Sequence, residues 1–326
     1  MNRRDALRLG GTCMALGLAR GSWAEEAFPN RIMKVVVAYP PGGVTDLAGR
    51  LIAEILNKEF GKTAIVENKG GGTGTIAQQY ILQQPRDGHV LLSGGLGGII
   101  LPVILNPNLP INPLTNFVPV AQLAEFVNVL VVGRDVKAQT VSELIDYVKA
   151  NPGKLNYATN GVGTSAHFTS ELFNLQAGTK LVHIPYRSSG EIITGLRNGD
   201  VHVAFANAPA VNALVQAGTL RAIAVTSAAR TKALPNVPTM VESGMPDFVV
   251  TSWLGAYAPT GTPPDVVKKI GDAIVKGGMM PENAQRLESA GFQVAVKDSA
   301  AYAEFNRTEL ARWKDVARRA NIQPES

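Results

Sequence analysis

The 326-residue sequence predicts an α/β fold in which mostly parallel sheets are flanked by helices. Short β-branched runs such as Ile32–Tyr39 alternate with segments whose apolar residues recur every three or four positions. The capping boxes Thr140-x-x-Glu143 and Ser188-x-x-Glu191 mark two helix starts. With 45% hydrophobic and 17% charged residues, the composition excludes a disordered chain, and the length suffices for two domains.

The first expected helix follows the turn at Pro40–Gly43. Its apolar stripe begins at Leu47, Thr45 or Asp46 can cap its start, and Gly61 ends it. Further helices are expected after Thr140, around Phe168, after Ser188, after Thr262 and from Asp298. The expected strands are Ile32–Tyr39, Thr63–Glu67, His89–Ser93, Asn128–Val132, Leu155–Thr159, Leu181–Pro185, Val201–Phe205 and Leu220–Thr226.

The chain shows no repeat and no low-complexity linker between two domains. It is therefore expected to cross between them more than once, through the extended stretches Val120–Phe126 and Val249–Tyr257. This places a signal peptide at residues 1–24, one lobe at 25–125 plus 251–326, and the other lobe at 126–250.

Residues 1–24 have the features of a secretory signal peptide. Arg3, Arg4 and Arg8 precede the apolar run Cys13–Ala19, and Ser22–Ala24 fits a cleavage site. We expect export to the periplasm through the Sec route or, given the paired arginines, the twin-arginine route. The segment holds four arginines and one aspartate, so its loss lowers the net charge from +5 to +2 and removes any argument for nucleic-acid binding. The mature chain then contains no cysteine, because the single cysteine lies inside the segment.

Three strand-to-helix junctions are rich in small and hydroxyl residues: Tyr39–Asp46, Gly161–His167 and Pro185–Ser189. Ligands of open α/β sheets collect at such junctions, and free N–H groups at helix starts suit an anion. Any one of these loops is more simply explained as a tight turn, which needs glycine and capping residues anyway. Three on one chain favour a shared ligand cleft.

Some residues of these junctions have two interpretations. Asp46 is a helix cap, or a ligand contact that favours an ammonium group. Arg187 pairs with a second ligand carboxylate, or it lies solvated at the rim. Trp253 packs under the ligand, or it belongs to the core.

Enzyme motifs are scarce. The four histidines form no pair with metal-binding spacing, and no G-x-S-x-G elbow is present. Gly161-x-Gly163-x-x-Ala166 matches a dinucleotide fingerprint and keeps an NAD-linked oxidoreductase open as an alternative. The acid that this fingerprint requires about 20 residues further on is missing, because the next strand ends in Pro185-Tyr186-Arg187.

The order of several motifs resembles that of the Bug-type (TctC-like) receptors of tripartite tricarboxylate transporters. The resemblance covers residues 28 to 320. Its motifs are Pro40-Pro41-Gly42-Gly43-x-Thr45-Asp46-x-x-x-Arg50, Val66-Glu67-Asn68-Lys69-Gly70-Gly71-Gly72-x-Gly74, Gly161-x-Gly163-x-x-x-His167, Pro185-Tyr186-Arg187, Asn198-Gly199-Asp200-Val201, Trp253-x-Gly255 and Ala258-Pro259-x-Gly261-Thr262-Pro263.

The resemblance implies a two-lobed type II periplasmic binding protein, without enzymatic activity, cofactor or metal, that holds a ligand between its lobes. The ligand would be a small organic carboxylate: a dicarboxylate, a tricarboxylate, an aromatic acid or, in some members, an acidic amino acid. Its partners would be membrane transporter subunits, bound transiently by a monomer; a sensor protein is the alternative partner. The implied ligand-binding residues are Tyr39, Pro41, Gly42, Gly43, Thr45, Asp46, Gly163, Thr164, Ser165, His167, Arg187, Ser188, Ser189 and Asn207.

This sequence departs from the usual pattern of the family at three positions. Ser188 replaces a common glycine and adds a donor, Ala206, before Asn207, replaces a frequent aspartate, and His89 replaces a common tyrosine. The loss of an acidic side chain at position 206 is expected to reduce the electrostatic repulsion of a second ligand carboxylate.

Overall fold

The computed structural model describes residues 28–319, 321 and 322. The described residues from Arg31 onward form one compact unit. The expected signal peptide at 1–24 lies outside the described residues. In the part of the chain that is described, no helix combines the length and the apolar character needed to cross a bilayer.

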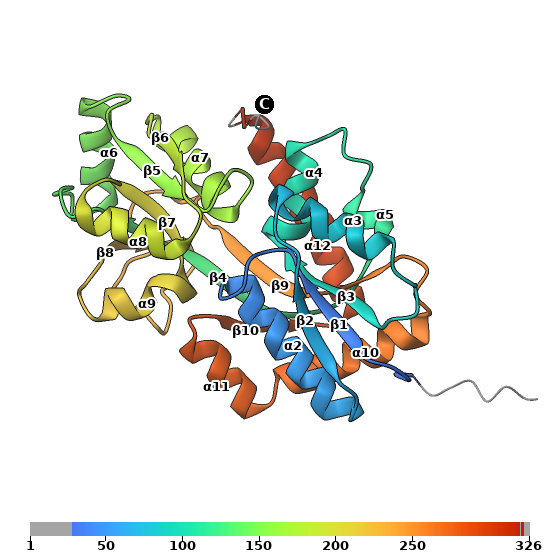
Figure 1. The fold of residues 1–326 in the computed structure, drawn as a ribbon. Helices are drawn as coiled ribbons and strands as arrows, with labels where there is room; N and C mark the ends of the chain where they lie inside the picture. Colours follow the sequence, from blue (N-terminus) through green and yellow to red (C-terminus); the bar gives the residue numbers. More distant parts are fainter. Residues whose placement is uncertain (1–27, 320, 323–326) are drawn as a thin grey trace, which may run out of the picture. The chain divides into compact units, whose positions relative to one another are not determined.

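The strands of the described residues join into a single hydrogen-bonded path in the order β2-β1-β3-β9-β4-β7-β5-β6, with β8 and β10 also paired to β4 (Figure 1). The ladders around β1 and around β5 are parallel, whereas β4 and β9 pair antiparallel with their neighbours. The strands are β1 Met33–Val37, β2 Ala64–Asn68, β3 Val90–Gly95, β4 Phe117–Val132, β5 Asn156–Thr159, β6 Val182–Pro185, β7 Val203–Asn207, β8 Arg221–Val225, β9 Thr251–Pro259 and β10 Gln293–Lys297.

Strand β4 connects two groups of strands. Its first part, up to Val127, pairs with β9 and β10, and its last part, from Asn128, pairs with β7 and β8. The sequence predicts a separate strand at Asn128–Val132 and an extended crossing before it. The structure corrects this, because both belong to one strand of 16 residues. The second expected crossing, Val249–Tyr257, largely coincides with β9.

Helices cover the strands on both groups (Figure 1). The capping boxes correctly predict the starts of α6 and α8, where the Thr140 and Ser188 hydroxyls accept from the N–H groups of Glu143 and Glu191. The helices of eight or more residues are α2 Val44–Phe60, α3 Thr75–Leu82, α6 Val141–Ala150, α7 Ser165–Ala177, α8 Ser189–Asn198, α9 Ala208–Gln216, α10 Pro264–Gly278, α11 Pro281–Ser289 and α12 Ser299–Arg319. Shorter helical segments are η1 Gly72–Gly74, η2 Leu96–Ile100, α4 Leu101–Leu105 and α5 Pro113–Asn116.

The start of α2 differs from the prediction. The N-cap residue is Gly43, which has no side chain that could accept a hydrogen bond from the first turn. Thr45 and Asp46, the two predicted caps, lie inside the helix instead. Leu47 is 44% exposed and does not belong to the buried stripe, which runs through Ala48, Leu51, Ile52 and Ile55. The end is as predicted: Gly61 takes the left-handed conformation at φ 61°.

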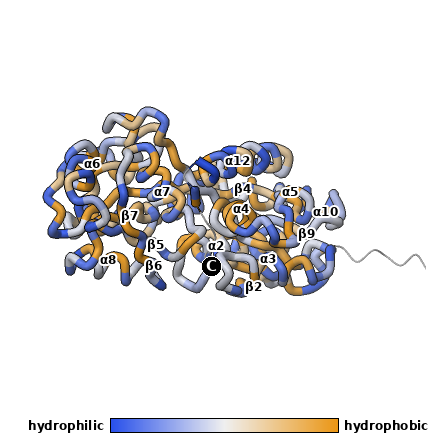
Figure 2. Tube along the Cα trace, turned by 90° about the horizontal axis from the view of Figure 1, so that it is seen from above, coloured by the Kyte–Doolittle hydropathy of each residue, from blue (hydrophilic) through white to orange (hydrophobic). Residues whose placement is uncertain are grey.

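Apolar burial positions the helices against the strands. Helix α8 buries Ile192, Gly195 and Leu196, a spacing that keeps one face against the sheet. Figure 2 accordingly shows polar and apolar residues alternating along this helix. Trp253 of β9 is fully buried, and its ring makes an edge-to-face contact with that of Phe305. It therefore belongs to the core, which is the second of the two interpretations given above.

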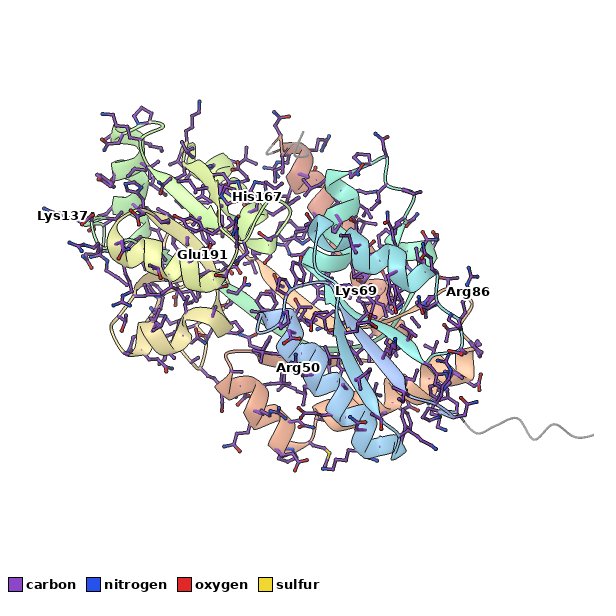
Figure 3. All side chains as sticks on the ribbon, in the orientation of Figure 1. Arg50, Lys69, Arg86, Lys137, His167 and Glu191 are labelled. Carbon is purple, nitrogen blue, oxygen red and sulfur yellow. The ribbon has the colours of Figure 1, made fainter. Side chains whose placement is uncertain are left out.

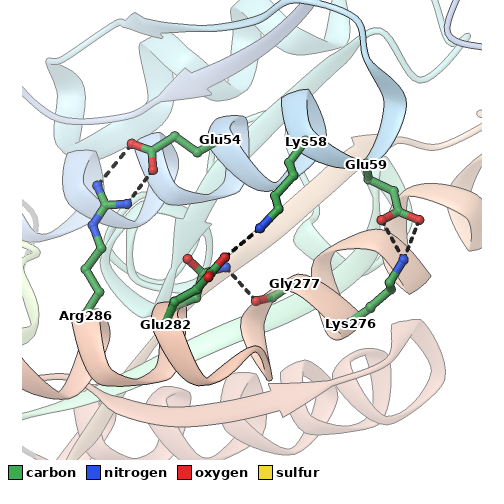
Figure 4. Close-up of polar contacts among 8 residues, drawn as sticks. Glu54, Lys58, Glu59, Lys276, Gly277, Glu282 and Arg286 are labelled. Atoms are coloured by element: carbon green, nitrogen blue, oxygen red, sulfur yellow. Dashed lines mark hydrogen bonds and ion pairs between the residues drawn. The ribbon is translucent and has the colours of Figure 1, made fainter.

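Ion pairs connect the outer side of α2 to α10 and α11 (Figure 4). Lys58 Nζ lies 2.6 Å from Glu282 Oε1, and Lys276 Nζ lies 2.8 Å from Glu59 Oε2. Arg286 pairs with Glu54 through both guanidinium nitrogens. Because these pairs are exposed, each contributes little to the free energy of folding. Their effect is to hold α2 in place beside α10 and α11.

Candidate functional site

The carboxyl ends of β1, β2 and β3 bring three loops together. The parallel registers place Val37 beside both Asn68 and Ser93, so the loops that follow begin at one edge of the sheet. A Cβ added to Gly70 would lie 3.3 Å from Pro40, and one added to Gly97 would lie 2.8 Å from the Tyr39 hydroxyl oxygen. The Tyr39 ring therefore sits under the β3 loop, and burial raises the pKa of its hydroxyl.

Asp46 organises the first of these loops. Its Oδ2 accepts hydrogen bonds from Gly42 N and Arg50 Nε, both at 2.9 Å, and its Oδ1 accepts one from Asn68 Nδ2, also at 2.9 Å. Figure 3 labels Arg50 on α2. The same Asn68 amide group donates to the Tyr39 carbonyl oxygen at 3.0 Å. Burial alone would raise the pKa of Asp46, but the three donors outweigh it and lower the pKa. The carboxylate thus fixes the loop from within.

The N-terminus of α2 presents free backbone donors to the other side of this loop. Pro41, Gly42 and Gly43 are exposed and Thr45 is half-buried. Within the described residues, no side chain caps the first turn of α2. The four N–H groups that begin a helix lack intrahelical partners and carry the positive end of the dipole, so this turn suits an anion.

The second predicted loop precedes α7. The Thr164 hydroxyl accepts from His167 N at 3.3 Å and donates to the Gly161 carbonyl oxygen at 2.9 Å. Gly163, Ser165 and His167 are buried, and His167 Nδ1 accepts from Gly163 N at 3.4 Å. Thr164 is therefore a helix cap, and its loop is closed by its own hydrogen bonds.

A stack of rings supports this loop from behind. The ring centroid of His183 lies 4.7 Å from that of His167 and 4.9 Å from that of Tyr157. His183 Nε2 lies 2.6 Å from the Thr159 hydroxyl oxygen. Burial, with a smaller contribution from the charge of His183, lowers the pKa of His167 to about 4. Burial also lowers the pKa of His183, so both rings are neutral at pH 7.

A short hydrogen-bonded chain connects α7 to β4. Asn128 Nδ2 donates to the Thr169 hydroxyl at 2.8 Å, and that hydroxyl donates to the Ser165 carbonyl oxygen at 2.7 Å. The backbone of Asn128 is in turn held by the Thr226 hydroxyl at 2.9 Å. The first turn of α7 is thus coupled to the strand that crosses between the two groups of strands.

The third predicted loop precedes α8, and its residues point in different directions. Ser188 is exposed and serves as the N-cap. Arg187 is exposed, and its side chain makes no recorded ion pair in the described residues. Ser189 is turned inward, and its hydroxyl donates to Asn160 Oδ1 at 3.3 Å.

Ser189 and Asn207 border a small hollow at the carboxyl ends of β5 and β7. Asn207 begins α9 without forming a side-chain cap, and its Oδ1 is buried with no hydrogen-bond partner among the described residues. The hollow is lined by Ala158, Asn160, Ala166, Ser189, Ile192, Ile193, Ala204, Phe205, Ala206, Asn207 and Val211. A larger hollow between the segment after α4 and the end of α12 includes none of the predicted site residues.

Loops of the two groups of strands are in contact around Thr73 and Gly163. The Thr73 hydroxyl donates to the Val162 carbonyl oxygen at 3.4 Å. A Cβ added to Gly163 would lie 2.6 Å from Thr73 Cγ2 and 2.5 Å from Leu105 Cδ1. The structure therefore brings the turn after β2 against the loop before α7.

Sequence reasoning missed three residues of this region. Asn68, Thr73 and Asn160 appear in no predicted site list, yet they hold Asp46, Val162 and Ser189. Asn68 ends β2, Thr73 lies in the turn that follows it, and Asn160 follows β5, so a position at or after the end of a strand was the available indication. The glycine-rich turn at Gly70–Gly74, which resembles a phosphate loop only superficially, packs against neighbouring loops instead.

Comparison with protein families gives a match over residues 48–322 to the tripartite tricarboxylate transporter family receptor. Protein BugT of Bordetella pertussis is 31% identical over 319 residues, covering 98% of each chain. A Cupriavidus necator protein encoded in the gbd 5' region is 33% identical over 333 residues, covering 99% of each chain.

Solved structures agree with these sequence matches. R. palustris Rpa4515 with adipate superposes with a TM-score of 0.86 at 30% identity, covering 91% of this chain and 100% of its own. MatC of Rhodopseudomonas palustris with bound malate gives a TM-score of 0.81 at 30% identity, covering 89% and 99%. The periplasmic binding protein BugD gives 0.83 at 29% identity, covering 91% and 100%. The α/β fold is therefore that of the type II periplasmic binding proteins, as predicted.

Proposed function

The chain belongs to the family of tripartite tricarboxylate transporter receptors, and on this premise we propose that it captures a small organic carboxylate in the periplasm. The ligand is a dicarboxylate, a tricarboxylate or an aromatic acid. The observation that carries the proposal is the first turn of α2, whose N–H groups face outward without a side-chain cap. Two relatives of known structure were solved with adipate and malate, which are dicarboxylates.

The proposed site spans two lobes, residues 25–125 plus 251–326 and residues 126–250. One ligand carboxylate binds the Tyr39–Asp46 loop through neutral N–H groups, hydroxyls and water. The other lobe contributes the loops before α7 and α8 together with Asn207, with Arg187 at the rim. Closure bends the chain where β4 passes from one group of strands to the other, and the contact between Thr73 and Val162 supports a closed arrangement of these loops.

Export and partners complete the proposal. Residues 1–24 direct the chain out of the cytoplasm by the Sec or the twin-arginine route, and the monomeric receptor then meets membrane transporter subunits transiently. A sensor protein is the alternative partner, and it would use the same ligand site. Co-purification of the closed, ligand-loaded receptor with transporter subunits, and not with sensor domains, tests this part.

A thermal-shift screen tests the ligand class. Di-, tri- and aromatic carboxylates are compared with NAD, NADP and ATP, because a ligand that binds the native state alone raises the melting temperature. We expect a shift with at least one carboxylate and none with nucleotides. A shift with NAD alone would instead support the oxidoreductase built on Gly161–Ala166, an activity foreign to this receptor family.

A further inference from the structure

We propose that the groove between the segment 103–116 and the C-terminal half of α12 is the surface on which a membrane transporter subunit docks, through an apolar segment that carries carboxylates. The proposal rests on the proposed function, because it takes the transporter as the partner. It adds the place and the chemistry of the contact, which we call the α12 groove, and it makes this contact depend on ligand capture.

The α12 groove has an apolar floor. It has a volume of about 900 Å³ and lies where α12 contacts α4 and α5 (Figure 1). Its buried lining residues include Ile111, Leu310 and Ala317. Leu114, in contrast, is 40% exposed. The segment also contributes Pro107, Pro110 and Pro113, which have no N–H group to donate. A partner therefore gains mainly apolar contact here.

The rim of the α12 groove is positively charged. Lys314 is exposed and forms no ion pair within the described residues, and Arg318 lines the groove one helical turn further on. Arg318 and Arg319 share a single carboxylate, that of Asp315, at 2.5 and 3.8 Å. None of the described residues that line the groove is acidic. This rim favours a partner segment with carboxylates, because complementary charges steer association and exclude other partners.

The helix that forms one wall of the groove also contacts the other group of strands. The Trp313 ring meets the Phe168 ring edge to face, with the ring centroids 5.9 Å apart. Phe168 lies in the first turn of α7, directly after His167 of the second predicted ligand loop. One face of α12 is thus packed against α7, while Lys314 and Arg318 line the groove on another face.

The segment that forms the other wall reaches the same loop. Leu105 ends α4, and its Cδ1 would lie 2.5 Å from a Cβ added to Gly163. Val103 and Ile104, which precede it, line the groove. Both walls therefore touch the loop before α7 or the helix start that follows it. Closure of the proposed lobes over an acid makes these contacts and opening breaks them, so the shape of the groove depends on whether ligand is held.

A membrane transporter subunit is the occupant that these features favour. A receptor that delivers its ligand to the membrane needs a contact that distinguishes the loaded state from the empty one, and closure sets both walls of this groove. The contact must also be released after delivery, and a small apolar floor with a charged rim suits a transient interface. A second copy of the chain docked groove to groove would oppose two cationic rims. Anionic lipid would bind the rim whether or not the lobes are closed.

Photo-cross-linking tests the docking surface. Leu114 is replaced by p-benzoylphenylalanine, and Met279, which is 62% exposed at the end of α10, is replaced as the control. Each receptor is irradiated with vesicles of phosphatidylethanolamine and phosphatidylglycerol, with and without the transporter's membrane subunits. The acid added is whichever of succinate, malate, adipate, citrate and benzoate raises the melting temperature. We expect position 114, and not position 279, to form an adduct with a membrane subunit, several times more abundant when the acid is present.

The other outcomes overturn separate parts of the proposal. An adduct of position 114 with lipid or with a second receptor, no adduct, or an equal yield from position 279 overturns the docking surface. An adduct that is equally abundant without the acid overturns the link to closure. Capture of the acid, measured by the melting temperature, is unaffected in each case, so the proposed ligand stands. Absence of any thermal shift overturns the proposed function instead.

Lys314→Glu tests the charge of the rim. The reversed charge repels the carboxylates of the partner, so we expect about tenfold less adduct from position 114. The affinity for the acid, measured by calorimetry, should be unchanged. Lys62→Glu is the matched control, because Lys62 is also exposed and without an ion pair in the described part of the chain, but lies in the turn between α2 and β2. Equal losses in the two variants, or no loss in Lys314→Glu, would show that the rim does not recognise the partner.

Discussion

Thr73 and Val162 are joined by a hydrogen bond of 3.4 Å, although 89 residues separate them in the sequence. The bond connects the turn after β2 with the loop before α7, and Gly163 lies directly beside it. The two groups of strands therefore approach each other here through glycine and a hydroxyl side chain, with no room for a larger residue.

Gly163→Ala should destabilise this approach. The residue has φ +78°, and its new methyl group would lie 2.6 Å from Thr73 Cγ2 and 2.5 Å from Leu105 Cδ1. We expect a loss of about 1–3 kcal/mol in the free energy of unfolding, measured in urea, together with weaker carboxylate binding. Gly153→Ala is the control, because Gly153 has φ +72° and nothing within 4 Å of its new methyl group. Equal losses in the two variants would show that backbone strain alone, and not the contact, matters.

Ser188→Ala should remove the N-cap of α8 and so lower the stability of the fold. The Ser188 hydroxyl accepts from Glu191 N at 3.3 Å, as the Thr140 hydroxyl accepts from Glu143 N at 3.2 Å. Each alanine variant is expected to lower the free energy of unfolding by about 0.5–2 kcal/mol. Titration with the bound acid then distinguishes the two positions: a loss of affinity in Ser188→Ala but not in Thr140→Ala would show that Ser188 also donates to the ligand.

Local patterns in the sequence predict much of this fold. The capping box at Ser188 and the terminal Gly199 fix both ends of α8, since each needs only neighbours within one turn. Helix α11 was not predicted because its face is polar, with Leu287 as its one buried residue in the described part. Helix α9 was missed for another reason: its sequence is largely apolar, and its N-cap, Asn207, forms no side-chain cap.

The candidate site could be predicted only as a set of loops. The junctions follow from the alternation of strands and helices, but the partners inside them depend on register. Asn68 reaches Asp46 because β1 and β2 pair with Val37 opposite Asn68, a relation that no local pattern contains. The same applies to Thr73, whose partner lies in the other group of strands.

Acidification should destabilise the protein through His167. Its pKa is about 4 in the folded chain, below the ordinary value of 6.5, so the unfolded chain binds more protons between these pH values. The contribution of neutral His167 to the free energy of unfolding is complete above pH 6.5. It is lost as the pH falls toward 4, by about 1.4 kcal/mol per pH unit for this group. Urea unfolding of the wild type and of His167→Gln from pH 7 to pH 4.5 measures this loss. Identical slopes in the two proteins would contradict the assignment.

Asn207→Ala should change ligand choice without weakening the fold. The Oδ1 atom of Asn207 is a buried acceptor without a partner in the described residues, and the side chain does not cap α9. A hydroxyl on the ligand would satisfy it, so we expect malate to bind more tightly than succinate by about tenfold, and the variant to abolish this preference. Asn212→Ala is the control, because Asn212 also carries an unpartnered Oδ1 but lines a different hollow, beside Lys232. A preference that survives in Asn207→Ala, or disappears in Asn212→Ala, would place the hydroxyl contact elsewhere.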